Sequence, residues 1–185
     1  MSWIEIIDEH EATGELATIY NDIAGERGKV SNIMRVHSLL PETMSSHMDL
    51  YLDVMFSRSG LSREECEMIA TVVSTKNECP YCINHHAVAL NAYWRDEERL
   101  EAFIEEWRSL DLSDRRTAML EYASKLTESP GSVAEEDLEP LRNAGLDDEN
   151  ILNLNLVVSY FNFVNRIAQG LGVEFSETEM QGYEY

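Results

Sequence analysis

Two cysteines near the middle of the chain have a spacing that can support redox chemistry. Cys79 and Cys82 are separated by two residues, and His85 and His86 follow three and four residues after Cys82. Cys-x-x-Cys pairs are among the places where thiol pKa values fall, and their sulfurs can close a small disulfide ring. His86 shares one helical face with Cys82. The pattern predicts a reactive thiol with a base beside it.

A helix that begins at Pro80 would place these thiols in its first turn. Proline is favoured at the first helical position, which makes Cys79 the N-cap. Cys82 then stands at the third helical position, where free backbone N–H groups and the helix dipole stabilise a thiolate. Because the thiolate is the reactive species, this placement favours a reactive Cys82.

An acidic residue twelve positions before the cysteine pair can complete a proton path. Glu67 precedes the apolar residues 68–70, and a carboxylate in such surroundings is costly unless it is paired. An imidazole from the next helix is a natural partner, and the pairing would orient His86 as a base toward Cys82. The alternative is that Glu67 is a solvated helix residue beside Glu64 and Glu65.

Helical periodicity runs through nearly the whole chain, and no alternating strand pattern stands out. Gly25 and Gly28 are expected to break the chain after the first helix, and Ser62 with Glu65 forms a capping box. The tail 174–185 is polar and is expected to be loose or bound to a partner. We expect one all-α domain over residues 1–185, with its core motif at 60–94. The expected helices are 11–24, a segment from 41, 63–76, 80–93, 95–106, 114–127, 135–143 and 147–170.

An internal similarity recurs along the chain. Residues 60–62 (Gly-Leu-Ser) resemble residues 145–147 (Gly-Leu-Asp), residues 72–74 match residues 157–159, and Asn77 matches Asn162. The second stretch has apolar residues where the first has Glu67, both cysteines and His86. A duplicated helical unit with a degenerate second repeat at 145–172 explains the pattern. Chance similarity between two amphipathic helices is the alternative.

Composition limits the classes of partner. The 185 residues are 44% hydrophobic, enough for a folded core, and carry a net charge of −21. Such an acidic chain is a poor ligand for nucleic acids and for anionic membranes. Without a basic leader or a long apolar run, the expected location is cytoplasmic. In a reducing compartment, a cysteine pair indicates redox or metal chemistry before a structural disulfide.

Zinc binding is the main chemical alternative to a redox pair, and a structural disulfide or inert helix cysteines are the non-functional ones. Structural zinc sites normally combine two separated ligand pairs, whereas this chain has one such pair. We therefore expect no metal and no cofactor. The residues that could supply zinc ligands are Cys79, Cys82, His85, His86, Cys66 and His47.

The order Glu67, eleven residues, Cys79-x-x-Cys82 and then His86 resembles the core motif of AhpD-like alkylhydroperoxidases, in the carboxymuconolactone decarboxylase superfamily. Residues 61–65, 69–70, 73–74, 77 and 165–166 also resemble its peroxidase-related branch. The likeness covers most of the chain and is strongest from 30 to 94.

The resemblance implies an AhpD-like helical bundle, assembled as a homo-oligomer with three or six subunits. It also implies reduction of hydrogen peroxide or organic hydroperoxides by a thiol pair. Cys82 would be the attacking thiol and would pass through a sulfenic acid. Cys79 would be the proton donor and resolving thiol. His86 with Glu67 would deprotonate Cys82 through a water, and a thiol protein or a small thiol would restore the pair.

One position departs from the family pattern. Tyr81 stands where the best-studied branch has a histidine, and a tyrosine does not titrate near neutral pH. Tyr81 and His85 are therefore only possible helpers. Two other functions stay open: an enzyme like carboxymuconolactone decarboxylase that does not need the cysteines, and a non-catalytic, redox-responsive oligomer.

Overall fold

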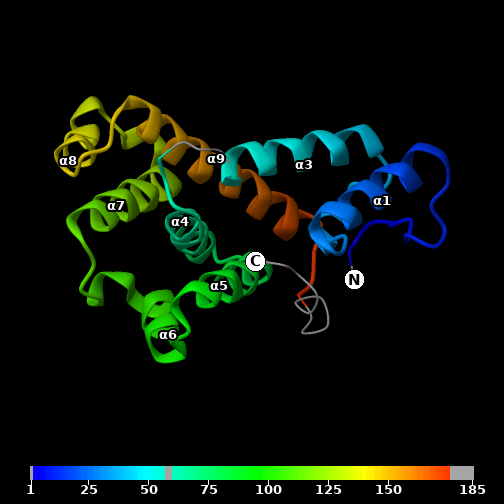
Figure 1. Cartoon of the computed structure of the whole chain (residues 1–185), viewed down its shortest axis with the longest axis horizontal. Helices are drawn as coiled ribbons and strands as arrows, with labels where there is room; N and C mark the ends of the chain where they lie inside the picture. Colours follow the sequence, from blue (N-terminus) through cyan, green and yellow to red (C-terminus); the bar gives the residue numbers. More distant parts are fainter. Residues whose placement is uncertain (1, 57–59, 176–185) are drawn as a thin grey trace.

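The computed structural model describes residues 2–56 and 60–175, and every regular element in these ranges is helical (Figure 1). The all-α fold predicted from the sequence is confirmed. No helix among the described residues is long and apolar enough to cross a membrane. The elements are α1 (Gly14–Arg27), α2 (Asn32–Arg35), α3 (Pro41–Phe56), α4 (Arg63–Lys76), α5 (Pro80–Trp94), α6 (Glu97–Glu106), η1 (Trp107–Ser109), α7 (Asp114–Glu128), η2 (Pro130–Ser132), η3 (Glu135–Leu138), α8 (Glu139–Asn143) and α9 (Asp148–Gly170).

Helix α4 is the central helix of the molecule. It packs against α5, α7 and α9, and Figure 1 shows it nearly end-on among them. Its residues 65–74 are all buried, although a helix at the surface would alternate buried and exposed faces. A residue anywhere on this stretch is therefore enclosed by neighbouring helices, and Glu67 is one of them.

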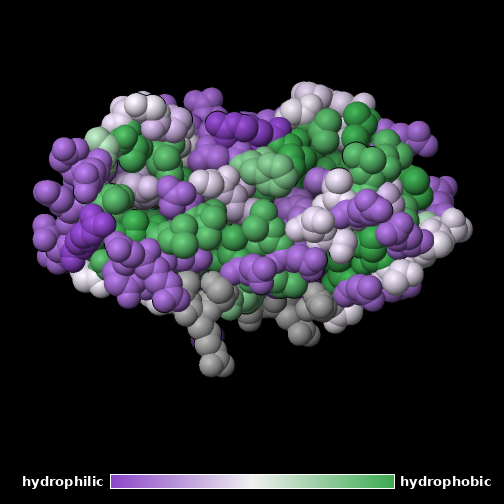
Figure 2. All heavy atoms as spheres, turned by 90° about the horizontal axis from the view of Figure 1, so that it is seen from above, coloured by the Kyte–Doolittle hydropathy of each residue, from purple (hydrophilic) through white to green (hydrophobic). Residues whose placement is uncertain are grey.

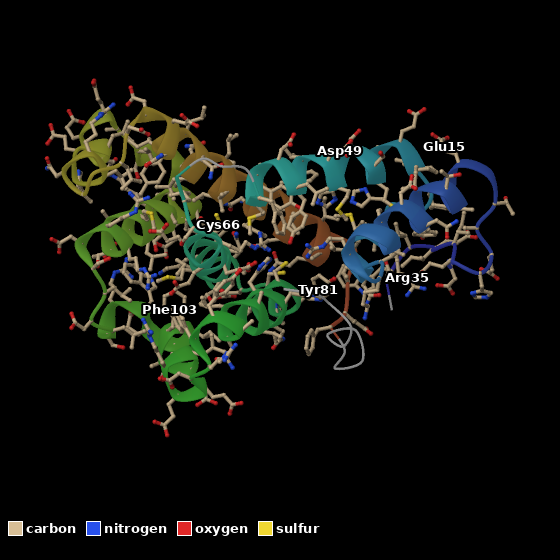
Figure 3. All side chains as sticks on the ribbon, in the orientation of Figure 1. Glu15, Arg35, Asp49, Cys66, Tyr81 and Phe103 are labelled. Atoms are coloured by element: carbon tan, nitrogen blue, oxygen red, sulfur yellow. The ribbon has the colours of Figure 1, made fainter. Side chains whose placement is uncertain are left out.

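Across the molecule, charged side chains lie mainly at the surface and large apolar side chains mainly in the interior. Glu15 and Asp49 project outward, whereas Cys66 and Phe103 lie inside (Figure 3). The side of the molecule that is uppermost in Figure 1, along which α3 and α9 run, carries hydrophobic surface between hydrophilic margins (Figure 2). Both helices expose large apolar side chains, namely Leu50, Phe56, Leu152, Leu156 and Phe163.

The turn between α4 and α5 sets the positions of the cysteines. Ser62 and Glu65 form the predicted capping box at the start of α4, with bonds of 3.1 and 2.8 Å. Three residues join α4 to α5, and Glu78 among them has a φ of +52°, which reverses the chain tightly. As predicted, Cys79 is the N-cap of α5 and Pro80 opens the helix.

Several expected boundaries were wrong. The first helix begins at Gly14 rather than at residue 11, and α6 begins at Glu97 rather than at residue 95. Gly25 does not break the chain, because it lies inside α1, where a glycine costs only about 1 kcal/mol. Gly28 ends the helix with a φ of +79° and bonds back to the carbonyl of Ala24. The segment 135–143 is not one helix but η3 followed by α8, since Pro140 enters in its middle. The tail prediction from residue 176 onward lies outside the described residues.

The matched positions of the internal similarity adopt the same local structures. Gly60 and Gly145 both have positive φ, +79° and +86°. Ser62 caps α4 and Asp147 caps α9 through their side chains. Asn77 lies beside its counterpart in α9, with its amide nitrogen 3.0 Å from the side-chain oxygen of Asn162. These agreements support a duplicated unit, which stays a prediction.

Candidate active site

The two motif cysteines face each other in reduced form. The Sγ atoms of Cys79 and Cys82 are 3.0 Å apart, and each residue is only 1% exposed. A disulfide requires about 2.05 Å, so the sulfurs need to approach by about 1 Å to form the bond. The first turn of α5 thus holds a dithiol that is close to the geometry of its disulfide.

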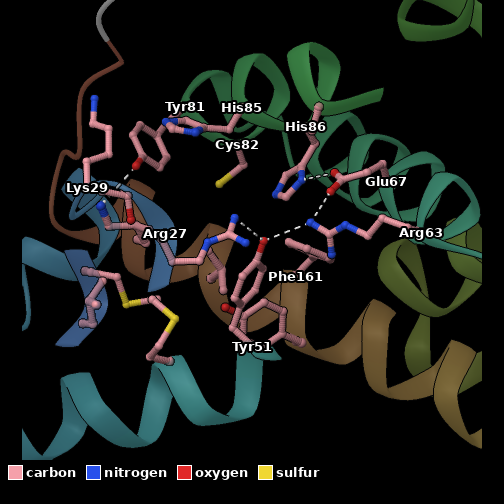
Figure 4. A pocket seen from close by; sticks show the side chains of 18 residues that line it. Arg27, Lys29, Tyr51, Arg63, Glu67, Tyr81, Cys82, His85, His86 and Phe161 are labelled. Atoms are coloured by element: carbon pink, nitrogen blue, oxygen red, sulfur yellow. Dashed lines mark hydrogen bonds and ion pairs between the residues drawn. The ribbon is translucent and has the colours of Figure 1, made fainter. Parts of the chain in front are cut away.

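A cavity of about 100 Å³ opens next to the pair, between α1, α3, α4, α5 and α9 (Figure 4). Cys82 and His86 line it, together with apolar side chains that include Met48 and Phe161. Among the described residues, Cys79 is not part of its lining. A molecule in the cavity would therefore meet Cys82 first, with Cys79 behind it.

His86 has the carboxylate partner that its spacing predicted. Its Nδ1 lies 2.7 Å from Oε2 of Glu67, and the other carboxylate oxygen lies 2.6 Å from Arg63 (Figure 4). Burial alone would raise the pKa of Glu67, but His86, Arg63 and Arg27 outweigh it and hold the pKa below its usual value. An ionised Glu67 fixes Nδ1 of His86 as a donor and leaves Nε2 to accept a proton.

The polar network continues beyond the predicted residues. Arg63 also donates to the hydroxyl of Tyr51 at 3.0 Å, and Arg27 donates to the same hydroxyl at 3.3 Å. Sequence reasoning missed these three residues. Only Arg63 carried a signal, because it stands four residues before Glu67 on the same helix. Tyr51 and Arg27 come from other helices, and nothing in their spacing points to the site.

The two thiols titrate as one unit. The hydrogen bond from Cys82 lowers the pKa of Cys79. The same hydrogen bond, together with burial, raises the pKa of Cys82, and a hydrogen bond from the buried Asn165 opposes that rise. The pair therefore loses its first proton readily and its second with difficulty. These directions place the first negative charge on Cys79, with the Cys82 thiol donating to it, so a Cys82 thiolate forms only when Cys82 gives up its proton.

Tyr81 and His85, the possible helpers, also reach the cavity. The hydroxyl of Tyr81 accepts a hydrogen bond of 3.1 Å from the backbone N–H of Ile33, and its ring centre lies 4.4 Å from that of His85. Both residues are part of the lining, although His85 was expected on another face than His86. Tyr81 therefore ties α5 to α2 where the resembling branch has a titrating histidine.

The residues considered as zinc ligands have other surroundings. Both ring nitrogens of His47 lie within hydrogen-bond distance of other residues, His37 at 3.1 Å and Tyr160 at 2.9 Å. Burial raises the pKa of the Cys66 thiol to about 12. Within residues 2–56 and 60–175, no three side chains of His, Cys, Asp or Glu are placed to share a metal ion.

Comparisons with known proteins point to one family. Residues 41–125, which include Glu67, both motif cysteines and His86, match the carboxymuconolactone decarboxylase family. The crystal structure of an uncharacterized peroxidase-related protein from Silicibacter sp. TM1040 has a TM-score of 0.86 at 27% identity, covering 97% of this chain and 94% of that chain. The family match and the structural likeness support a place for this chain in the carboxymuconolactone decarboxylase superfamily.

Two further proteins are similar to this chain. An alkylhydroperoxidase AhpD core, from an uncharacterized peroxidase-related protein of Ralstonia eutropha JMP134, has a TM-score of 0.86 at 23% identity and the same coverage, 97% and 94%. At that identity the likeness shows the fold alone. The uncharacterized protein YdfG of Bacillus subtilis (strain 168) is 26% identical over 144 residues, 77% of this chain and 96% of YdfG. The resemblance to the AhpD-like, peroxidase-related branch is confirmed.

Proposed function

We propose that the protein is a cysteine-based peroxidase that reduces hydrogen peroxide or organic hydroperoxides through Cys79 and Cys82. The observation that carries the proposal is the layered arrangement of the site. Cys82 lines the cavity beside the His86–Glu67 pair, and Cys79 lies 3.0 Å behind it. This order supports Cys82 as the attacking thiol, His86 as its base and Cys79 as the resolving thiol.

The first step is attack by the Cys82 thiolate. His86 takes the proton of Cys82 through a water, and Glu67 stabilises the imidazolium that forms. The sulfur then bonds to the distal oxygen of the peroxide while the O–O bond breaks. Cys82 becomes a sulfenic acid, and the proximal oxygen leaves as alkoxide or hydroxide and takes up a proton.

The second step closes the disulfide. Cys79 attacks the sulfur of the sulfenic acid, a water molecule leaves, and the two sulfurs move together by about 1 Å. The sum is one peroxide and two thiols converted to an alcohol or water, one water and one disulfide. An external thiol reductant, either a protein or a small thiol, restores the pair. A homo-oligomeric state and a cytoplasmic location stay predictions.

Turnover with a small dithiol tests the proposal. The protein should consume cumene hydroperoxide catalytically in the presence of dithiothreitol, and Cys82→Ser should abolish this consumption. The matched control is Cys66→Ser, because Cys66 is also buried but is not part of the cavity lining. Activity that survives in Cys82→Ser would contradict the mechanism. Oxidation without turnover would favour a non-catalytic, redox-responsive oligomer.

The family match supports a second candidate, an enzyme like carboxymuconolactone decarboxylase. The cavity has three cationic side chains in its lining, Arg27, Lys29 and Arg63, which suit an anionic organic acid. Such an enzyme does not need the cysteine pair. Decarboxylation of a carboxylated lactone that is undiminished in Cys82→Ser would favour this candidate over the peroxidase.

A further inference from the structure

A row of hydrogen-bonded side chains leads from the surface to the cavity. Thr43 is exposed, and its hydroxyl lies 3.2 Å from Nδ1 of His37. Nε2 of His37 lies 3.1 Å from Nδ1 of His47, which is buried. Nε2 of His47 lies 2.9 Å from the hydroxyl of Tyr160, and Tyr160 lines the cavity with Cys82. The row joins α3 to α9, and the ring centre of Tyr160 lies 6.0 Å from that of Tyr51, which belongs to the Glu67 network.

Such a row can carry a proton inward. The Thr43 hydroxyl donates to the carbonyl of Leu40 at 2.7 Å, so it accepts from Nδ1–H of His37. With both imidazoles neutral, His47 donates to His37 and Tyr160 donates to His47. In the opposite arrangement His37 carries a proton on both nitrogens and donates to Nδ1 of His47. His47, as its Nε2–H tautomer, then donates to Tyr160, and the Tyr160 O–H faces the cavity. Two directions of one connected row are what a proton relay requires.

The surroundings of the row suit this task. Burial, with the charge of His37 added, lowers the pKa of His47 to about 4, so this imidazole is neutral near pH 7. Burial also lowers the pKa of His37, so the protonated His37 that starts the relay is a minor state near pH 7 and forms transiently. Burial raises the pKa of Tyr160, and the charges of Tyr51 and Cys82 raise it further. Tyr160 therefore keeps its proton near neutral pH, and its side chain shares the cavity with the reacting sulfur.

In the proposed reaction the leaving oxygen needs a proton. The helix that carries the cysteines, α5, does not supply a donor on the side where this oxygen leaves. In-line attack by Cys82 drives the leaving oxygen away from α5, the helix that also carries His86. Cys79, the proton donor that the family resemblance implies, is not part of the cavity lining. Tyr160 stands on α9, another wall of the same cavity.

We propose that Tyr160 donates the proton to the leaving oxygen and that His47 and His37 replace it from solvent. The proposal rests on the proposed peroxidase function. As the S–O bond forms and the O–O bond breaks, the alkoxide takes the Tyr160 proton. His37 starts with a proton on each ring nitrogen. Tyr160 takes the Nε2 proton of His47, and His47 takes the Nε2 proton of His37 at Nδ1. His37 is left neutral, and it binds a proton from water at Nε2 after His47 and Tyr160 have returned to their inward-facing starting directions. Tyr160 is then a catalytic residue, and the two histidines act through it.

Two oxidants with different leaving groups test the relay. tert-Butyl hydroperoxide releases a strongly basic alkoxide that needs an acid, whereas peracetic acid releases acetate, which does not. In single-turnover stopped-flow experiments, Tyr160→Phe should slow the reaction with tert-butyl hydroperoxide by about 10²-fold and leave that with peracetic acid within about a factor of three. The wild-type reaction with tert-butyl hydroperoxide should also show a solvent deuterium isotope effect, which Tyr160→Phe diminishes.

Tyr122→Phe is the matched control. Tyr122 is a buried tyrosine of α7 whose hydroxyl accepts from Asn155 at 2.8 Å, and it is not part of the cavity lining. This variant should react with both oxidants as the wild type does. Equal slowing of both oxidants by Tyr160→Phe, or no slowing, would overturn the relay. A wild type that reduces neither oxidant would overturn the peroxidase function and the relay with it.

His47→Gln is a second variant of the row, so the test does not depend on whether Tyr160→Phe folds. It keeps the Tyr160 hydroxyl and the volume of the side chain but cannot pass a proton between two ring nitrogens. It should reproduce the selective loss with tert-butyl hydroperoxide. A merely structural role for the row would change the rates with both oxidants by one factor, and that outcome would also overturn the proposal.

Discussion

At the scale of single residues, Glu67 supplies the negative charge that pairs with Arg63 and His86. It is 1% exposed and lies 2.6 Å from Arg63 and 2.7 Å from His86. Replacing it by glutamine leaves Arg63 without a counter-charge in a largely buried place. We expect Glu67→Gln to lower the free energy of unfolding by about 3 kcal/mol, as for other broken buried pairs. Urea unfolding at pH 7 measures this, and a change below about 1 kcal/mol would contradict it.

The same carboxylate predicts a dependence of stability on pH. The folded pKa of Glu67 lies below its unfolded value, because the pairing with His86, Arg63 and Arg27 outweighs the effect of burial. Its contribution is therefore complete above about pH 4.3 and is lost as the pH falls through the lower folded pKa. The unfolding free energy of Glu67→Gln should fall less steeply than that of the wild type below about pH 4.3. Parallel curves would contradict the assignment.

His86 and His85 offer a matched pair of variants. Both line the cavity, but His86 has the Glu67 partner. We expect His86→Ala to slow single-turnover reduction of peroxide by about 10² to 10⁴-fold, the usual contribution of a general base. His85→Ala should keep most of the rate. Stopped-flow measurements at one peroxide concentration compare them, and equal rates for the two variants would remove the base from the mechanism.

How far the sequence predicts the site depends on which helices its residues come from. The Glu67–His86 contact was predictable, because a buried acid needs a partner and the next helix offers an imidazole at the spacing of a known motif. Tyr51 and Tyr160 were not, because their distance from Cys82 in the sequence says nothing about their distance in space. The catalytic roles of all these residues stay predictions.

At the scale of elements, α9 supports the turn that holds the cysteines. Asn165 is fully buried, accepts from Asn77 at 2.9 Å, donates to Ser74 at 3.2 Å and donates to Cys82. Asn165→Ala would leave buried polar groups unsatisfied at the end of α4. We expect a loss of about 1–3 kcal/mol in unfolding free energy and a slower thiol reaction.

A second asparagine of the same helix is the control for this variant. Asn155 donates to Tyr122 at 2.8 Å, away from the cavity lining. Asn155→Ala should leave the rate of Cys82 alkylation by iodoacetamide unchanged, whereas Asn165→Ala should lower it. Equal alkylation rates in both variants would show that α9 does not act on the thiols.

Helix boundaries were predictable where the cap residues decide them. The helix 63–76 was placed correctly because Ser62 and Glu65 satisfy its first backbone donors, and the start of α5 follows from Pro80. The break at Gly25 was wrong because glycine lowers helix stability without ending a helix, and only the positive φ of Gly28 does so. The burial of α4 inside the bundle depends on how the other helices pack around it, so the residues of α4 alone could only suggest it.

At the scale of the whole molecule, the resemblance predicts an assembly of three or six subunits. The exposed apolar side chains of α3 and α9, which include Leu152 at 59% and Phe163 at 47% exposure, suit contact between subunits (Figure 2). Light scattering coupled to size-exclusion chromatography should therefore give three or six times the chain mass of 21.2 kDa. A monomer at micromolar concentration would contradict this prediction.

The charge of the whole molecule also bears on the site. The chain has a net charge of −21, yet the described part of the cavity lining contains three cationic side chains and one carboxylate. Composition alone predicted an acidic surface, and it could not predict that cations gather at the cavity. The packing of α1 against α3 brings Arg27 to the hydroxyl of Tyr51, which also accepts from Arg63 of α4.

The most direct measurement counts thiols after one turnover. Reduced protein is mixed with one equivalent of cumene hydroperoxide without reductant, and free thiols are titrated after denaturation. The account predicts that two of the three thiols disappear and that Cys66 remains, with peptide mapping showing a Cys79–Cys82 disulfide. In Cys79→Ser, a sulfenic acid at Cys82 should be trapped by dimedone. Retention of both Cys79 and Cys82 as free thiols would contradict the account.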